Sequence, residues 1–248
     1  MSHPKPGQEV TFEVEGRSYT GRYGDSLLGE LRKLGYEVPS LCYHEAVSPY
    51  GACRLCLVEV QKGRKRKVTT SCNYPLQDGI EVSLDTDAVQ RHRKLVFQML
   101  MAKAPQARQV RELAAEYGVT DTPFEVQPED RDRECILCGL CARVCGEVVG
   151  AHAIDFSGRG LNKSMKSPYD ETAEDCIGCG ACVYVCPTDC IGLEEKDGVR
   201  TIVRWHRDLP LSKCARCGRE FYPTFMLDRF ARRLGVGRDH FEVCPDCR

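Results

Sequence analysis

The sequence predicts an α+β chain made of several small modules, each held together by a metal site rather than by one large apolar core. Two observations lead to this fold class. Seventeen of the 248 residues are cysteine, an unusual number for a chain of this length. Only 42% of the residues are apolar, and a chain so rich in glycine, proline and charge cannot build one large core from them. The formal net charge of −1 gives no overall attraction to nucleic acid or to an anionic membrane.

The state of the cysteines depends on the compartment. The N-terminus has no apolar stretch of the kind that marks a secretory signal, and no segment reaches the roughly 18 apolar residues of a membrane span. We therefore expect a cytoplasmic location, no direct membrane span and reduced thiols. Reduced thiols in this number indicate metal ligands rather than disulfides. They form four groups of four, and Cys190 is left over.

The two central groups predict a domain over residues 134–198 with two [4Fe–4S] clusters. Both groups have the spacing C-x2-C-x2-C-x3-C, in which the fourth cysteine of each run binds the cluster of the other run. The expected ligands are Cys135, Cys138, Cys141 and Cys186 for the first cluster, and Cys176, Cys179, Cys182 and Cys145 for the second. Zinc is the alternative, but zinc sites pair two C-x2-C knuckles and do not need three thiols in succession.

The first group predicts a [2Fe–2S] cluster in a β-grasp-like, ferredoxin-like domain over residues 1–85. The expected ligands are Cys42, Cys53, Cys56 and Cys72, with a structural zinc site as the alternative. Apolar residues alternate with polar ones over residues 10–14, which is typical of a half-buried strand, and residues 19–23 are expected to return as a second strand. A helix over residues 26–34, capped by Asp25, is expected to follow.

Residues 86–133 are expected to form a helical connector and a linker. Apolar residues recur at helical spacing over residues 86–118, with an interruption at Pro105. One broad apolar face is expected, formed by Val89, Leu95, Val96, Met99 and Leu100. Residues 120–133 carry two prolines and seven charges, which indicates an exposed linker.

The last group predicts a small zinc-ribbon-like module over residues 199–248. Its cysteines form two C-x2-C knuckles separated by 26 residues, namely Cys214, Cys217, Cys244 and Cys247. Four thiolates in this form favour one structural Zn²⁺, with a further iron site as the alternative. Between the knuckles an amphipathic helix is expected over residues 224–234, with Phe225, Leu227, Phe230, Ala231 and Leu234 as its apolar contacts.

Two features have the composition of nucleic-acid-binding sites. Residues 200–248 are rich in arginine, but arginine on a small domain is more often a solvated or partner-facing surface. A basic run over residues 62–67 lies between two expected strands, so we expect it at a solvated hairpin tip rather than in an RNA-binding patch. Nucleic acid is therefore not an expected partner.

The order of these motifs resembles the N-terminal region of the large iron-sulfur subunit of NADH dehydrogenase (complex I). It is also similar to the short diaphorase or iron-sulfur subunits of NAD-reducing or electron-bifurcating hydrogenases, and to those of NAD-dependent formate dehydrogenases. The resemblance spans about residues 8–195 and is carried by residues 51–60, 135–145, 153–160 and 176–182. Many members bind an additional cluster in the connector through one histidine and three cysteines. The connector of this chain has no cysteine, so that cluster is not expected.

The resemblance implies a non-catalytic electron-relay subunit of a multi-subunit, NAD(P)H-linked oxidoreductase. Its expected partners are a flavin/NADH-binding subunit and a hydrogenase or other catalytic subunit. The sequence has no glycine-rich dinucleotide or phosphate motif in a suitable position, so no catalytic residue is predicted.

Two rival functions stay open. The iron-sulfur subunit of succinate dehydrogenase or fumarate reductase has a similar module order, but one of its later runs commonly lacks a thiol, and both runs are complete here. A redox-sensing regulator that binds DNA through the C-terminal knuckles is the second rival.

Overall fold

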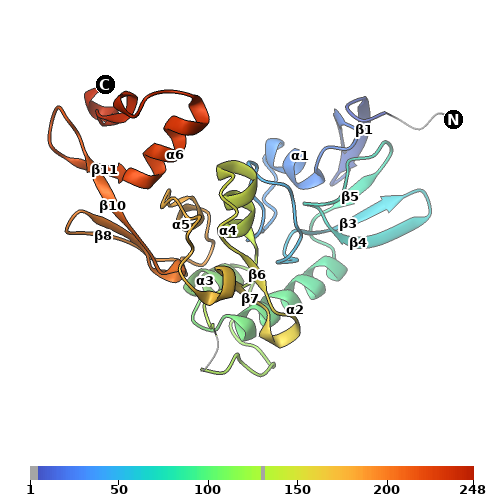
Figure 1. Cartoon of the computed structure of the whole chain (residues 1–248). Helices are drawn as coiled ribbons and strands as arrows, with labels where there is room; N and C mark the ends of the chain where they lie inside the picture. Colours follow the sequence, from blue (N-terminus) through green and yellow to red (C-terminus); the bar gives the residue numbers. More distant parts are fainter. Residues whose placement is uncertain (1–4, 130–131) are drawn as a thin grey trace. The chain divides into compact units, whose positions relative to one another are not determined.

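The computed structural model describes residues 5–129 and 132–248, and it divides into two compact units, Met1–Cys138 and Gly139–Arg248 (Figure 1). The first four residues of the N-terminal segment, for which the sequence predicts no signal, and residues 130–131 of the expected linker lie outside the described residues. Helices and strands are mixed in both units, as the sequence predicts. Within the described ranges no helix has the length and apolar character needed to cross a membrane.

The first unit is built on a five-stranded sheet with the order β2-β1-β5-β3-β4. Its strands are β1 (Glu9–Val14), β2 (Arg17–Arg22), β3 (Leu57–Lys62), β4 (Lys65–Thr70) and β5 (Glu81–Ser83). The pairing of β1 with β5 is parallel, and the other neighbours are antiparallel. Every second side chain of β1 points into the core. These residues, Val10, Phe12 and Val14, are buried against the helix α1 (Leu27–Lys33). The expected first strand is confirmed.

The start of α1 differs from the sequence prediction by one residue. The N-cap is Ser26 rather than Asp25, because the Ser26 hydroxyl accepts a hydrogen bond from the amide of Gly29 at 3.4 Å. The same hydroxyl donates to the main-chain oxygen of Cys72 at 2.8 Å. Ser26 therefore both caps the helix and binds the main chain of Cys72, the fourth cysteine of the first group.

The connector consists of α2 (Asp87–Lys103) and α3 (Arg108–Glu116), and the expected interruption at Pro105 is confirmed. The expected apolar face of α2 is wrong in part. Leu95 and Met99 are 45% and 55% exposed, whereas the buried residues are Val89, Arg93, Phe97, Met101 and Ala102. The face is rotated because the buried Arg93 binds main-chain oxygens of the sheet region, which fixes the helix orientation.

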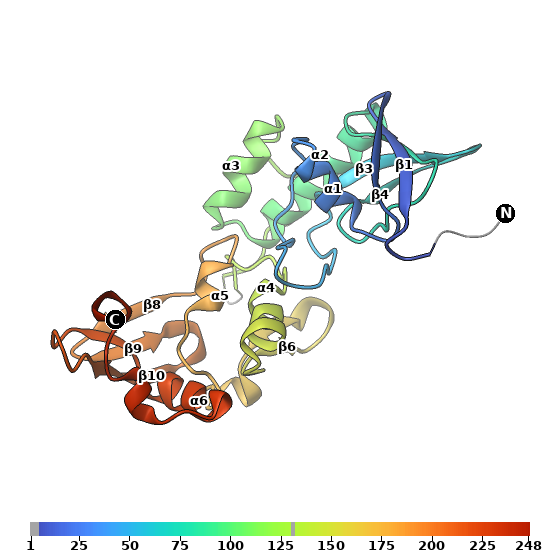
Figure 2. The same ribbon diagram turned by 90° about the horizontal axis from the view of Figure 1, so that it is seen from above.

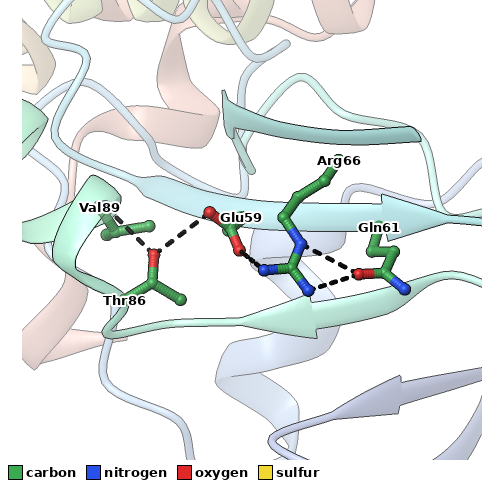
Figure 3. A network of polar contacts seen from close by, with 5 residues as sticks. All are labelled: Glu59, Gln61, Arg66, Thr86 and Val89. Carbon is green, nitrogen blue, oxygen red and sulfur yellow. Dashed lines mark hydrogen bonds and ion pairs between the residues drawn. The ribbon is translucent and has the colours of Figure 1, made fainter. Parts of the chain in front are cut away.

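Arg66, a residue of the basic run in the β3–β4 hairpin, contacts side chains of its own unit (Figure 3). The Arg66 guanidinium donates to the side-chain oxygen of Gln61 at 2.7 and 3.0 Å and forms an ion pair with Glu59 at 3.4 Å. Glu59 in turn accepts from the hydroxyl of Thr86, which caps α2. The expected hairpin position of the run is confirmed.

The second unit begins with α4 (Leu140–Arg143) and a π-helical turn (Val144–Val149) and contains a four-stranded antiparallel sheet with the order β11-β10-β9-β8. The other elements are β6 (Asp155–Ser157), β7 (Ser164–Lys166), α5 (Ala181–Tyr184), β8 (Leu193–Lys196), β9 (Val199–Ile202), β10 (Arg207–Lys213), β11 (Glu220–Pro223) and α6 (Thr224–Leu234). Short 3₁₀ turns lie at Gly160–Asn162, Pro168–Asp170, Val203–Trp205, Arg238–Phe241 and Pro245–Cys247.

Helix α6 has the bounds that the sequence predicts, and Figure 2 shows it alongside β10. Met226, Leu227 and Ala231 are buried, but Leu234 is 65% exposed, contrary to the prediction. Leu234 lies at the last residue of the helix, directly before Gly235 reverses the chain with a φ of +67°. The terminal turn thus carries its apolar side chain away from the core.

Candidate iron-sulfur and metal centres

The four cysteines of the first group are all buried in the first unit. Three of them lie between α1 and β3, and Cys72 follows β4. The amide of Leu41 donates to the sulfur of Cys53, and the amide of Cys53 donates to the sulfur of Cys42, both at 3.4 Å. Amides aimed at sulfur stabilise the thiolate form, which is the form that binds metal. The donor set therefore fits a cluster held by four thiolates.

Contacts among these sulfurs shift the pKa values of the thiols in opposite directions. Hydrogen bonds from the thiols of Cys53 and Cys72 lower the pKa of Cys42 to about 2. The bond to Cys42 raises the pKa of Cys53, and bonds to Cys42 and Cys56 raise that of Cys72. The bond from Cys72 lowers the pKa of Cys56 to about 7. Because one network connects all four thiols, the structure brings this predicted ligand set together.

The first C-x2-C-x2-C run is divided between the two units. Cys135 and Cys138 end the first unit, whereas Cys141 lies on α4 of the second unit. The amide of Leu137 donates to the sulfur of Cys135 at 3.4 Å, and Leu137 has a φ of +55°, so the loop turns sharply around this sulfur. Cys186, expected as the fourth ligand, lies after α5. The grouping of these four cysteines stays a prediction.

Four cysteines of the second unit line one pocket. They are Cys145, Cys176, Cys179 and Cys182, and the other lining residues are apolar, among them Ile154, Ile177 and Ile202. Cys145 comes from the first run and the other three from the second, which is the set that crossed ligation requires. The amide of Ala153 donates to the sulfur of Cys145 at 3.4 Å. These sulfurs and their donor fit a [4Fe–4S] cluster.

Burial in the apolar pocket raises the thiol pKa values of Cys145 and Cys176, and that of Cys182 to about 12. The indole of Trp205 opposes the shift at Cys182, because its Nε1 donates to the sulfur at 3.4 Å. Thiols with raised pKa values stay protonated at neutral pH, and they lose the proton when they bind metal.

Residues that the sequence analysis did not single out hold the loop of the second run. Arg207 donates from Nε to the main-chain oxygen of Cys176 at 3.1 Å, and Arg200 donates from Nη1 to that of Gly178 at 2.9 Å. Both arginines belong to the sheet that follows the cysteine runs. Residue spacing does not predict these contacts, because each arginine binds a main-chain oxygen that is distant in the sequence. Trp205 could have been noticed only as the single tryptophan of the chain.

Cys190 lies beside a predicted ligand. Its sulfur is 3.6 Å from that of Cys186, which also contacts the hydroxyl of Thr188 at 3.6 Å. The hydrogen bond with Cys190 is the main cause that raises the pKa of Cys186, followed by burial.

The sulfurs of Cys214, Cys217, Cys244 and Cys247 all lie within 4.8 Å of one another. Cys214 and Cys217 lie in the loop between β10 and β11, and the other pair follows α6. The amide of Cys244 donates to the sulfur of Cys214 at 3.3 Å, and such backbone hydrogen bonds lower the pKa of Cys214 to about 6. Arg219 donates to the sulfur of Cys244 at 3.5 Å. Four converging sulfurs with cationic and amide donors fit a tetrahedral metal ion.

Comparisons with known proteins support iron-sulfur domains in this chain. A family model described as a 2Fe-2S iron-sulfur cluster binding domain matches residues 7–87. Two models described as a 4Fe-4S dicluster domain match residues 130–193 and residues 175–219. The chain therefore contains a 2Fe-2S domain followed by 4Fe-4S domains.

Several curated relatives align with 72% of this chain. The NADPH-Fe(3+) oxidoreductase subunit alpha of Geobacter sulfurreducens is 30% identical over 200 residues, and the NADH-ubiquinone oxidoreductase 75 kDa subunit of Reclinomonas americana is 28% identical over 200 residues. A solved structure of an NAD⁺-reducing [NiFe]-hydrogenase is similar with a TM-score of 0.57 and 27% identity, covering 64% of this chain and 74% of that chain. The chain is a homologue of these oxidoreductase subunits and of this hydrogenase chain.

The resemblance read from the motifs is thus confirmed for the iron-sulfur part of the homologues. The matched region is only 23% of the length of the first curated relative and 28% of the length of the second. The homologues are subunits of NAD(P)H-linked oxidoreductases, the larger of which continue far beyond the matched region.

Proposed function

We propose that this iron-sulfur homologue relays electrons between a flavin/NADH-binding subunit and a catalytic subunit, such as a hydrogenase. The observation that carries the proposal is the convergence of cysteine sulfurs with amide donors in a chain homologous to hydrogenase and NADH dehydrogenase subunits. When bound, iron-sulfur clusters accept and donate single electrons. The chain supplies the thiolates, the apolar surroundings and the hydrogen bonds that hold them.

The proposed ligand sets follow the sequence prediction. One [2Fe–2S] cluster binds Cys42, Cys53, Cys56 and Cys72. One [4Fe–4S] cluster binds Cys135, Cys138, Cys141 and Cys186, and the second binds Cys145, Cys176, Cys179 and Cys182. Cys214, Cys217, Cys244 and Cys247 bind one Zn²⁺. Because all four sets need reduced thiols, a cytoplasmic location fits the proposal.

Metal analysis of the protein purified without oxygen tests this inventory. One two-iron and two four-iron clusters with one zinc site predict about ten iron atoms and one zinc atom per chain. About fourteen iron atoms without zinc would replace the zinc site by a third four-iron cluster. A three-iron signal in the electron paramagnetic resonance (EPR) spectrum of undamaged protein would instead favour the succinate dehydrogenase rival.

The relay itself is tested with the native complex. Purification of the untagged assembly is expected to yield a flavoprotein together with this chain. NADH is then expected to reduce the clusters in the assembly, but not in the isolated chain, which has no nucleotide-binding motif of its own. Recovery of the chain without a flavoprotein, or rapid reduction of the isolated chain by NADH, contradicts the proposal.

A further inference from the structure

Trp205 contacts the pocket of the second unit from outside the two cysteine runs. It ends the 3₁₀ turn Val203–Trp205, between β9 and β10, and its side chain is 1% exposed. The indole Nε1 donates a hydrogen bond to the sulfur of Cys182 at 3.4 Å, and the ring also lines the pocket that holds this sulfur. A buried indole N–H needs an acceptor, and here that acceptor is a cysteine sulfur.

Main-chain hydrogen bonds fix the tryptophan against the cysteine loop. The amide of Ala173 donates to the main-chain oxygen of Trp205 at 3.2 Å. Two residues later Arg207 donates to the main-chain oxygens of Cys176 and Glu174, at 3.1 and 3.0 Å. The turn and the loop are therefore tied together at Trp205 itself and at Arg207. These bonds fix the backbone that carries the indole, and burial of the ring holds its N–H toward the sulfur.

We propose that Trp205 is a positioning residue that raises the reduction potential of the second [4Fe–4S] cluster. This inference rests on the proposed function, because it assumes that Cys182 is a ligand of that cluster. Reduction adds negative charge to a cluster and to its cysteine sulfurs, and an N–H donor stabilises the reduced form more than the oxidised form. The effect is larger in an apolar pocket than in water, because the local dielectric constant is low.

The indole is suited to this role by its hydrogen-bonding chemistry. Its N–H donates and has no lone pair that could bind iron or accept a proton. A phenylalanine at the same position keeps an aromatic ring in the core and removes the donor. Trp205→Phe therefore separates the hydrogen bond from most of the packing.

The first experiment is a redox titration of the full chain, followed by EPR. In Trp205→Phe the midpoint potential of one [4Fe–4S] cluster is expected to shift to a more negative value, while the [2Fe–2S] midpoint and the iron content stay at the wild-type values. The matched control is Tyr222→Phe, which changes an exposed aromatic residue on β11 of the same sheet and is expected to leave all midpoints unchanged.

A second measurement does not depend on a substitution. Because the chain has one tryptophan, ¹⁵N-labelled tryptophan gives a single indole N–H signal in the NMR spectrum. In the wild-type holoprotein this signal is expected to show a paramagnetic shift that changes when the clusters are reduced. This readout tests the contact between the indole and the cluster even if Trp205→Phe loses its cluster.

The outcomes separate this inference from the proposed function. With the full iron content, an unchanged midpoint in Trp205→Phe overturns the role of Trp205 alone, and so does an unshifted indole signal in the wild-type protein. Wild-type protein that lacks four of the expected iron atoms overturns the cluster assignment, and the role of Trp205 with it. A shifted indole signal together with a more negative midpoint in the variant supports both.

Discussion

The guanidinium of Arg93 donates a hydrogen bond at 2.8 Å to the main-chain oxygen of Leu57, the residue directly after the proposed ligand Cys56. A second bond, at 3.3 Å, goes to the main-chain oxygen of Leu84, and the guanidinium lies 5.2 Å from the ring centre of Tyr117. Arg93 is only 5% exposed. One buried cation thus joins both connector helices to the start of β3 and the end of β5.

Loss of this cation is expected to destabilise the first unit. Arg93→Met keeps the apolar stem but leaves the buried main-chain oxygen of Leu57 and the partly buried one of Leu84 without this donor, and an unsatisfied buried group costs about 1–3 kcal/mol. We expect thermal loss of the [2Fe–2S] absorption at a lower temperature, corresponding to a destabilisation of about 2 kcal/mol or more. The control is Arg91→Met, exposed on the same helix, with an expected effect within about 0.5 kcal/mol. If both variants lost the [2Fe–2S] absorption at the same temperature, the role of Arg93 would be contradicted.

Gly178 is expected to tolerate no side chain. Its φ is +68°, and a Cβ atom at this position would lie 2.6 Å from Leu209 Cδ1 and 3.1 Å from Pro223 Cγ. Gly178→Ala is therefore expected to push the C-terminal sheet away from the cysteine loop, and to lower the iron content through loss of the second [4Fe–4S] cluster. Gly235→Ala is the matched control, because Gly235 has a φ of +67° and no atom lies within 4 Å of the place that its Cβ would take.

The comparison of these two glycines separates backbone strain from a clash. The left-handed conformation alone costs an alanine about 1–2 kcal/mol, and both variants share this cost. Only Gly178→Ala adds the clash with Leu209. If both variants keep their full iron content in a colorimetric iron assay, the packing of the sheet against the loop does not stabilise the cluster.

Crossed ligation predicts which variants resemble each other. Cys145→Ser is expected to alter the same EPR signal as Cys176→Ser, although the two cysteines belong to different runs, because both line one pocket. Cys186→Ser is expected to alter the same signal as Cys135→Ser. The opposite pairing, in which each run alone supplies one cluster, would appear as a shared signal for Cys135→Ser and Cys145→Ser.

Cys244→Ser is expected to remove the zinc and to leave the iron content near ten atoms per chain. Cys244 accepts a hydrogen bond from Arg219 and lies fully buried, so the loss of the metal removes one of the ties between the β10–β11 loop and the segment after α6. Faster hydrogen exchange in α6 is the expected consequence, measured by mass spectrometry. Cys190→Ser is the control and is expected to keep both metals. Iron loss in Cys244→Ser with no change in zinc would reverse the metal assignment.

Local patterns were sufficient to predict several elements of the fold. The strand β1 and the helix α6 follow from apolar spacing alone, because each has one buried face. The orientation of α2 could not be predicted in this way. Its buried face includes Arg93, and the acceptors of Arg93 lie 36 and 9 residues away along the chain. An arginine counts as polar in any periodicity analysis, so the apolar spacing assigns the exposed Leu95 and Met99 to the core instead.

The candidate sites also have a part that local patterns predict, the ligands, and a part that they do not, the residues around the ligands. Cysteine spacing is a local property, and it was enough to propose all four ligand sets. The residues around those ligands are not local. Trp205 contacts a sulfur 23 residues earlier, and Arg207 contacts a main-chain oxygen 31 residues earlier. Such contacts depend on the path of the chain through the C-terminal sheet, and that path cannot be predicted from a single sequence.

The β8–β9 hairpin bears on how segments of this chain could be exchanged during evolution. The tight turn pairs Lys196 with Val199, so the boundary expected at residue 198 falls inside the hairpin. A recombination joint at that position would separate β8, an edge strand, from its neighbour β9 and leave a row of unpaired backbone groups. A joint before Leu193 would transfer the sheet whole, together with the tryptophan and the arginines that reach the cysteine loop. A transferred C-terminal segment therefore keeps all four strands of its sheet only when it begins before β8.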